Sequence, residues 1–125
     1  MNVLERIDFE CEASNDVNGL FSKDHVKHDC YIEYNGFGHR FTYQCNKKDT
    51  PKKEEVIACL TSDADGFDCT SDFEDFCDVF GYTKMSQYNE AMASYKACKA
   101  VSEYLNDTFT SEEREELDEL LENYR

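Results

Sequence analysis

The segment CYIEYNGFGHRFTYQC, residues 30–45, decides the fold of this chain because it predicts a β-hairpin. Apolar and polar residues alternate on both sides of its centre, which is typical of strands with one buried face. Its centre, Asn35-Gly36-Phe37-Gly38, contains residues that tolerate the positive φ of tight hairpin turns. We therefore expect antiparallel strands over 29–34 and 39–45. The side chains expected on their buried face are Cys30, Ile32, Tyr34, Phe41, Tyr43 and Cys45.

A third strand is predicted before the hairpin, over residues 6–13, because apolar residues alternate there with acidic ones. Between it and the hairpin, SNDVNGLFSKD (14–24) has the composition of a loop. The first 46 residues thus predict a three-stranded antiparallel meander. The inward-facing side chains of its first strand are expected to be Ile7, Phe9, Cys11 and Ala13.

From Thr50 onward the apolar residues recur at steps of three and four, which predicts helices. Thr50 is a suitable N-cap for a helix over 51–62, and the only proline of the chain follows it at the first helical position. Ser71 and Glu74 have the spacing of a capping box for a second helix, which Gly81 ends.

Two further helices are predicted in the last third of the chain. One covers about 86–107, and the other follows a second capping box formed by Thr110 and Glu113. The apolar stripe of the longer helix is expected to contain Tyr88, Met92, Tyr95, Cys98, Val101 and Leu105. The last helix is expected to bury Leu117, Leu120, Leu121 and Tyr124.

This order of elements predicts an α+β fold, in which about four helices pack on one face of the meander. A chain of 125 residues is expected to form a single domain over 1–125, with strands within 1–46 and helices within 50–125. Because 17 residues are Phe or Tyr, a folded core is expected despite the high charge. The seven cysteines contain no Cys-x-x-Cys pair and are interpreted as free thiols in a reducing cytosol.

The net charge of −15 is concentrated in two acidic segments. Residues 54–83 contain nine acids and no Lys or Arg, and the last 25 residues contain nine acids and two arginines. Such a field repels nucleic acids and anionic membranes and attracts basic surfaces. The charged N-terminus does not resemble a signal peptide, and no apolar run is long enough to span a membrane. We therefore expect a cytosolic protein with a basic partner.

Ten acidic residues are the candidates for binding that partner. The glutamates of the last helix fall on one side, opposite its leucines, and could imitate the phosphates of a nucleic acid. The alternative is a face that only makes the protein soluble. The aspartates come from the acidic segment around 63–75. The ten candidates are Glu112, Glu115, Glu116, Glu119, Glu122, Asp63, Asp65, Asp68, Asp72 and Asp75.

The stretch TSDADGFDCTSD (61–72) partly resembles a calcium-binding loop, but Thr61 stands where the first carboxylate is needed. We interpret it as a polar loop between two helices. HVKHDC (25–30) could contribute to a metal site with His39 or Cys45, but its spacing is not that of a zinc site. The sequence therefore predicts no metal and no cofactor. No phosphate-binding loop or hydrolase motif is present, and we expect no enzymatic activity.

Three segments resemble a family of small, mostly uncharacterised proteins of tailed phages and prophages. They are VIACLTSDA (56–64), FEDFCDVFGY (73–82) and AMASYKACKAVSEYLNDTF (91–109). The hairpin piece FTYQC (41–45), followed by Thr50-Pro51, is also similar to theirs, so that the resemblance covers about residues 39–110. It implies an origin in a phage or other mobile element and expression in bacterial cytoplasm. No activity and no functional residue come with it.

Charge and resemblance together predict a phage-encoded anti-defence inhibitor, of the anti-CRISPR or anti-restriction type. It would bind a basic nucleic-acid-binding protein of the bacterial host, such as a nuclease or its guide complex, through a DNA-mimicking surface. The alternative is a non-enzymatic phage accessory protein that binds another phage or host protein through an ordinary interface. Neither reading predicts direct contact with nucleic acid or membrane, and a monomer or homodimer is compatible with both.

Overall fold

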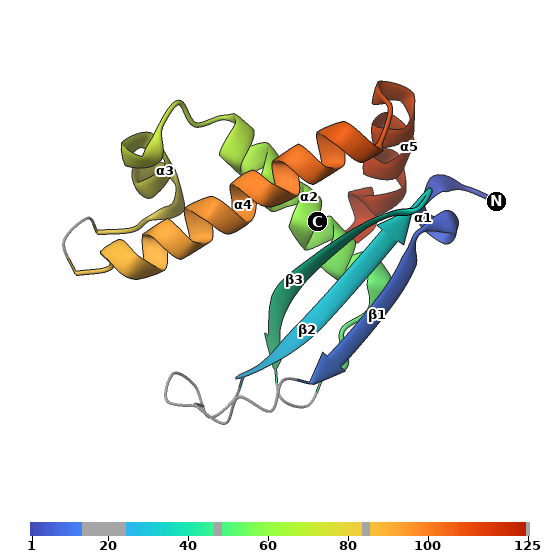
Figure 1. Ribbon diagram of the computed structural model, residues 1–125, viewed down its shortest axis with the longest axis horizontal. Helices are drawn as coiled ribbons and strands as arrows, with labels where there is room; N and C mark the ends of the chain where they lie inside the picture. The colour runs from blue at the N-terminus through green and yellow to red at the C-terminus, as the bar shows by residue number, and fades with distance from the viewer. Residues whose placement is uncertain (14–24, 47–48, 84–85, 125) are drawn as a thin grey trace.

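The computed structural model describes residues 1–13, 25–46, 49–83 and 86–124. The chain is an α+β fold in which a three-stranded antiparallel sheet precedes the main helices, as the sequence predicts. In Figure 1 the sheet lies at one end of the molecule, and the helices cross one side of it and extend beyond it. The predicted loop over 14–24 lies outside the described residues. None of the helices in the described part of the chain is long and apolar enough to cross a membrane.

The sheet has the strand order β1 (Asp8–Ala13), β2 (His25–Tyr34) and β3 (Phe37–Asn46). Both hairpin strands are longer than predicted: β2 begins at His25 instead of Asp29, and β3 begins at Phe37 because the turn uses only two residues. Asn35 and Gly36 have φ values of 52° and 85°. Two consecutive residues with positive φ give the tight turn whose twist matches that of paired strands.

One face of the sheet is buried, and the alternation predicted from the sequence is confirmed. Cys11, Cys30 and Phe41 lie side by side across the three strands. Ile32 and Tyr34 are each 1% exposed. This inner face receives the helices, and the opposite face is left to solvent.

A short helix that the sequence did not predict, α1 (Val3–Arg6), precedes the first strand. The Asn2 side chain accepts a hydrogen bond of 2.8 Å from the backbone N–H of Glu5 and so caps it. Val3 and Ile7 are buried on either side of this turn. Four residues are too few for a helical period to be recognised in a sequence.

Helix α2 (Lys53–Asp68) shows that the predicted boundaries, 51–62, were wrong at both ends. Thr50 is not the N-cap; Lys52 occupies that position without a side-chain hydrogen bond. The predicted polar loop after residue 61 is mostly helical, because Thr61 and Ala64 are completely buried and extend the stripe that packs on α4.

Helix α3 (Phe73–Phe80) is capped by Asp72 rather than by the predicted Ser71. The Asp72 carboxylate accepts a hydrogen bond of 2.8 Å from the backbone N–H of Asp75. The predicted end of this helix is confirmed. Gly81 has a φ of 79°, the left-handed conformation that favours glycine at a helix C-terminus.

The long helix α4 (Tyr88–Thr108) is followed by α5 (Ser111–Leu121) and the 3-10 turn η1 (Glu122–Tyr124). The capping box before α5 is confirmed, as is the burial of its Leu117 and Leu121, whereas Leu120 is only partly buried. Two tyrosines expected inside were predicted wrongly. Tyr88 is 53% exposed in the first turn of α4, and Tyr124 is 49% exposed because η1 departs from the α-helical path.

Apolar side chains form two separate groups. The sheet core lies between the inner face of the sheet and helices α1, α2, α4 and α5; it consists of Val3, Ile7, Ile32, Tyr34, Ile57, Ala58, Leu60, Ala64, Val101, Leu105, Phe109, Leu117 and Leu121. The aromatic cluster joins α3 to α2 and α4 at the other end of the molecule (Figure 1); it consists of Phe67, Phe73, Phe76, Phe80, Tyr82, Tyr88 and Tyr95.

Candidate acidic interface

Helix α5, which carries the predicted carboxylate face, is fixed to the sheet at its N-terminus. The Thr110 hydroxyl and the Glu113 carboxylate each accept a backbone hydrogen bond from the other residue, of 3.1 and 3.0 Å. The Glu113 carboxylate also accepts a hydrogen bond from the hydroxyl of the buried Tyr34. That hydrogen bond is the main reason why the pKa of Glu113 is lowered. The helix is therefore held at a defined position relative to the sheet.

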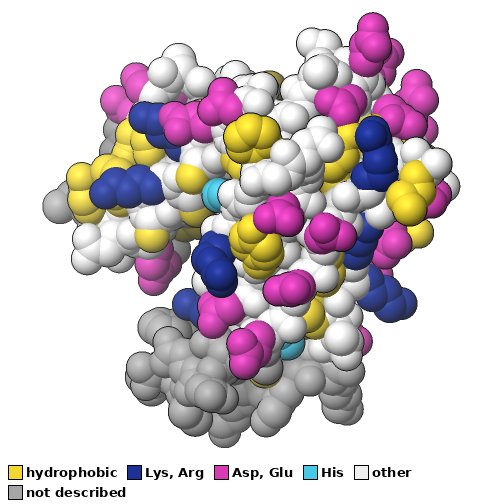
Figure 2. Space-filling model, turned by 45° about the vertical axis from the view of Figure 1, so that its right-hand side comes forward, with side chains coloured by type: hydrophobic (Ala, Val, Ile, Leu, Met, Phe, Trp, Pro, Cys, Tyr) yellow, Lys and Arg dark blue, Asp and Glu magenta, His cyan; other side chains and the backbone are white. Residues whose placement is uncertain are grey.

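The five predicted glutamates of α5 and η1 lie together on the solvent side of this helix. All are exposed, and none makes a hydrogen bond or ion pair with a residue that the structure describes. Figure 2 shows acidic side chains gathered at the upper right, over α5. We call these residues the α5 face; they are Glu112, Glu115, Glu116, Glu119 and Glu122.

Arg114 links α5 to α2 and reduces the free charge beside the α5 face. Its guanidinium contacts the Asp65 carboxylate at 2.8 Å and the Asp118 carboxylate at 3.1 Å. The Arg114 side chain is only 18% exposed. Asp65, a predicted binding residue, is thus held in an internal ion pair that joins the two acidic segments of the sequence.

The other predicted aspartates of α2 also have internal partners. The Cys59 thiol lies 3.8 Å from the Asp63 carboxylate, one turn along the helix, and burial raises the pKa of Asp63. Asp68 accepts a hydrogen bond of 2.5 Å from the hydroxyl of Ser102, which ties the end of α2 to α4. Asp68 therefore stabilises the packing of α2 on α4, whereas the contact of Asp63 lies within α2.

Asp72 and Asp75 lie at the start of α3, where both take part in capping. Besides the cap described above, the Asp75 carboxylate accepts a hydrogen bond of 3.0 Å from the backbone N–H of Ser71. Figure 1 places α3 and α5 at opposite ends of the longest dimension of the molecule. The ten predicted binding residues thus do not form one surface; the structure brings together those of α5 and separates them from these two.

A second acidic surface, on the outer face of the sheet, was missed by the sequence reasoning. Asp8 lies opposite Glu33, and Glu12 lies opposite Asp29, so that like charges face each other across β1 and β2. Glu10 lies between these pairs on the same face of β1. The acids that alternate with apolar residues in the first strand could have revealed this surface. Residues 1–53 are nearly neutral as a whole, so the net charge of that segment did not indicate it.

The two metal-binding alternatives find no geometric support. Residues 61–68 are helical, which spreads Asp63 and Asp65 along α2 instead of wrapping them around a cation. His28 and Cys30 lie on the inner face of β2, and His39 stacks on Tyr104 with ring centroids 5.0 Å apart. Across the described residues, no three His, Cys, Asp or Glu side chains are close enough to share a metal ion.

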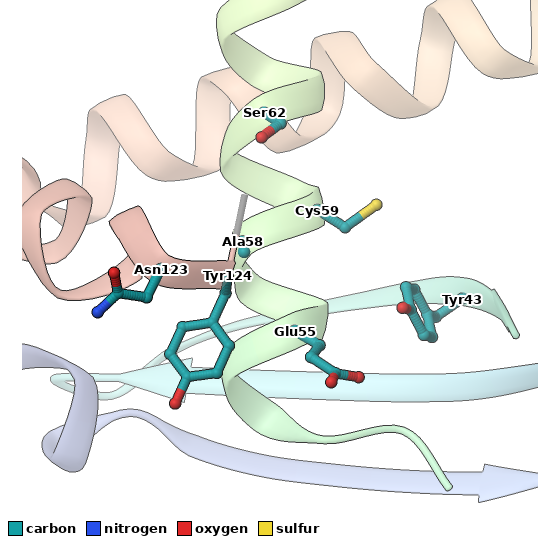
Figure 3. A pocket seen from close by; sticks show the side chains of 7 residues that line it. All are labelled: Tyr43, Glu55, Ala58, Cys59, Ser62, Asn123 and Tyr124. Carbon is teal, nitrogen blue, oxygen red and sulfur yellow. The ribbon is translucent and has the colours of Figure 1, made fainter. Parts of the chain in front are cut away.

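A pocket of about 460 Å³ opens where α5 ends, between β3, α2 and η1. Figure 3 shows Glu55 reaching out from α2, with the rings of Tyr43 and Tyr124 on either side of it. Burial is the main cause that raises the pKa of Tyr43, and the nearby Cys59 and Glu55 add to it. The residues that line the pocket are Tyr43, Glu55, Ala58, Cys59, Ser62, Asn123 and Tyr124.

Comparison with protein-family models, with curated proteins and with solved structures found no match for this chain. The resemblance to phage proteins therefore stays a prediction.

Proposed function

We propose that the protein is a phage-encoded, non-enzymatic inhibitor of a bacterial defence system, of the anti-CRISPR or anti-restriction type. It acts in the host cytoplasm and uses the α5 face to bind a basic, nucleic-acid-binding protein such as a nuclease or its guide complex. The observation that carries this proposal is the row of exposed glutamates on a helix whose position is fixed by Tyr34 and Arg114.

The spacing of the glutamates on the α5 face determines how closely they can imitate the phosphates of DNA. A helix rises about 1.5 Å per residue, so acids spaced by three or four residues supply about one charge per 5 Å. Duplex DNA supplies about one charge per 1.7 Å of axis. The α5 face is thus sparser than DNA, and acids outside α5 are needed to widen it. Asp65 and Asp118 lie next to it, but Arg114 partly neutralises both.

The test starts with a pull-down from bacterial host lysate, followed by competition of the recovered partner with DNA. We expect binding to weaken with salt, because exposed charges are screened within about 10 Å at 0.1 M. Replacing Glu115, Glu116 and Glu119 by Gln should weaken binding without unfolding the protein, since these side chains point away from the sheet core.

A matched variant separates the α5 face from net charge. The control variant replaces the exposed Asp78 by Asn and the exposed Glu90 and Glu103 by Gln. It changes the net charge by the same amount as the α5 variant but leaves α5 intact. This control should bind as the unchanged protein does. If both triple variants bind equally well and half-molar salt has no effect, the proposal is wrong.

The alternative is a phage accessory protein with an ordinary interface, and exposed apolar side chains favour a definite place for it. Val79 of α3 is 56% exposed, and Tyr88 of the aromatic cluster is 53% exposed. Binding that resists salt and is lost with Val79→Asp would support this alternative over the α5 face.

A further inference from the structure

We propose that the pocket beside η1 receives the guanidinium group of an arginine side chain from the basic partner. The inference rests on the proposed function for the origin of that arginine. It adds a definite site to what would otherwise be contact between charged surfaces.

The chemistry of the lining residues selects a planar cation. Glu55 is exposed, supplies a carboxylate and makes no hydrogen bond or ion pair with a described residue. Carboxylates bind guanidinium groups through paired, charge-assisted hydrogen bonds. The rings of Tyr43 and Tyr124 flank this carboxylate, and aromatic faces attract cations, arginine more often than lysine. Among the described residues that line the pocket, none is a Lys, Arg or His that would repel the ligand.

Size and position agree with this occupant. A volume of about 460 Å³ is sufficient for a single long side chain and lies within the usual range of small-ligand pockets, about 300–1,000 Å³. The pocket begins directly after Glu122, the last member of the α5 face, because Asn123 and Tyr124 belong to the turn that follows α5. A basic partner that covers both the α5 face and η1 would therefore also reach the pocket.

The pocket can be tested without the partner by using N-acetyl-arginine methylamide as the probe. Titration followed by NMR should shift the backbone amide signals of Cys59, Ser62 and Asn123 in a saturable way. The lysine analogue should bind more weakly, and the neutral citrulline analogue should bind least. Equal binding of all three probes, tighter binding of lysine, or no saturable shift would each overturn the proposal.

Two substitutions and a matched control locate the site. Glu55→Gln should lower the affinity for the arginine probe by about tenfold or more, because a charge-assisted hydrogen bond is lost. Tyr124→Leu should weaken it by about threefold, as expected for one partly exposed cation–π contact. Glu54→Gln makes the same chemical change one position away, outside the pocket, and should leave the affinity unchanged. Equal effects of Glu54→Gln and Glu55→Gln would place the probe elsewhere.

The cysteines supply an independent readout within one molecule. Cys59 lines the pocket, whereas Cys69 follows the end of α2; both are exposed. The arginine probe should slow alkylation of Cys59 and not of Cys69, as mapped by mass spectrometry. Equal protection of both thiols, or of neither, would contradict the assignment.

Failure of the pocket and failure of the proposed function give different results. Replacing Glu115, Glu116 and Glu119 by Gln should leave binding of the small probe unchanged, because none of them lines the pocket. If the probe binds but the partner ignores the α5 face, the proposed function is wrong and the pocket stands. If the partner needs the α5 face but the probe does not bind, the pocket inference alone fails.

Discussion

The sheet core draws buried side chains from α1, β2, α2, α4 and α5, and every member is at most 7% exposed. The aromatic cluster draws its rings from α2, α3, α4 and the segment after α3, and most of them remain partly exposed. Phe76 is the exception: it is completely buried and contacts four other rings. The packing of the first region is thus distributed over many buried side chains, whereas the second region has one fully buried ring at its centre.

This difference implies that the two ends open separately. The α5 face belongs to the end with the distributed core, so that its shape should survive when α3 loosens. Regions with few fully buried contacts open at lower free energy than the rest of a fold.

Phe76→Ala should lower the free energy of unfolding by about 3–5 kcal/mol, because it removes the centre of the aromatic cluster. Hydrogen exchange should show lost protection in α3 and retained protection in β2. Val79→Ala, in the same helix at a side chain 56% exposed, is the control and should change stability by less than about 0.5 kcal/mol. Equal loss of protection in α3 and β2 would show that the two ends unfold as one.

Tyr34→Phe should lower the free energy of unfolding by about 1–2 kcal/mol, because the hydroxyl that binds the Glu113 carboxylate is removed. The ring would keep its stacking on Phe109, with centroids 4.5 Å apart. Tyr31→Phe removes a similar hydroxyl, 2.9 Å from Glu33, on the solvent face and should have little effect. Urea denaturation measures the free energy of unfolding of both variants. Equal losses would show that the Tyr34 hydroxyl stabilises the fold no more than the Tyr31 hydroxyl does.

The two helix caps should act locally, each at a loss of about 1 kcal/mol. Asp72→Ala should raise hydrogen exchange in α3 and leave α5 unchanged, and Thr110→Ala should do the reverse. Thr110→Ser retains the capping oxygen and should preserve the protection of α5. Exchange that rises in both helices after either substitution would contradict the separation of the two ends.

The smallest effect expected is a response to mild acid that is confined to the sheet end. All three histidines belong to the sheet, and burial lowers the pKa of His39 below its ordinary value of 6.5. A lowered pKa means that the folded state disfavours the charged form, so stability should fall as the pH drops through 6.5. Protection in β3 should decrease between pH 7.5 and 5.5, and protection in α3 should not. His39→Phe should abolish this response while keeping the stacking on Tyr104.

Local patterns predicted the sheet well. The alternation in β1, β2 and β3 fixed which side chains are buried, since register in a half-buried sheet follows the apolar face. The capping box at Thr110 and the glycine end of α3 were also predictable, because both depend on a few neighbouring residues. These features need no knowledge of distant parts of the chain.

The missed features depend on contacts between distant residues. The second half of α2 has the composition of a loop, but packing of Thr61 and Ala64 on α4 keeps it helical. The ion pair of Arg114 with Asp65 joins two helices that a charge count treats as independent. The pocket combines β3 with residues near the C-terminus. Hence the sequence predicted the α5 face as a candidate, but it predicted neither the contacts of Tyr34 and Arg114 that hold α5 in place nor the pocket beside η1.

The like-charged pairs across β1 and β2 have a consequence for aggregation. β1 is an edge strand, and an edge strand offers unpaired backbone groups to a strand from another molecule. Asp8 opposite Glu33, and Glu12 opposite Asp29, weaken the isolated sheet, because like charges directly opposite are destabilising. A second copy that paired through its own β1 would bring Asp8, Glu10 and Glu12 beside the same three carboxylates and be repelled. These acids thus cost the sheet some stability, and they disfavour edge-to-edge pairing of copies at high concentration.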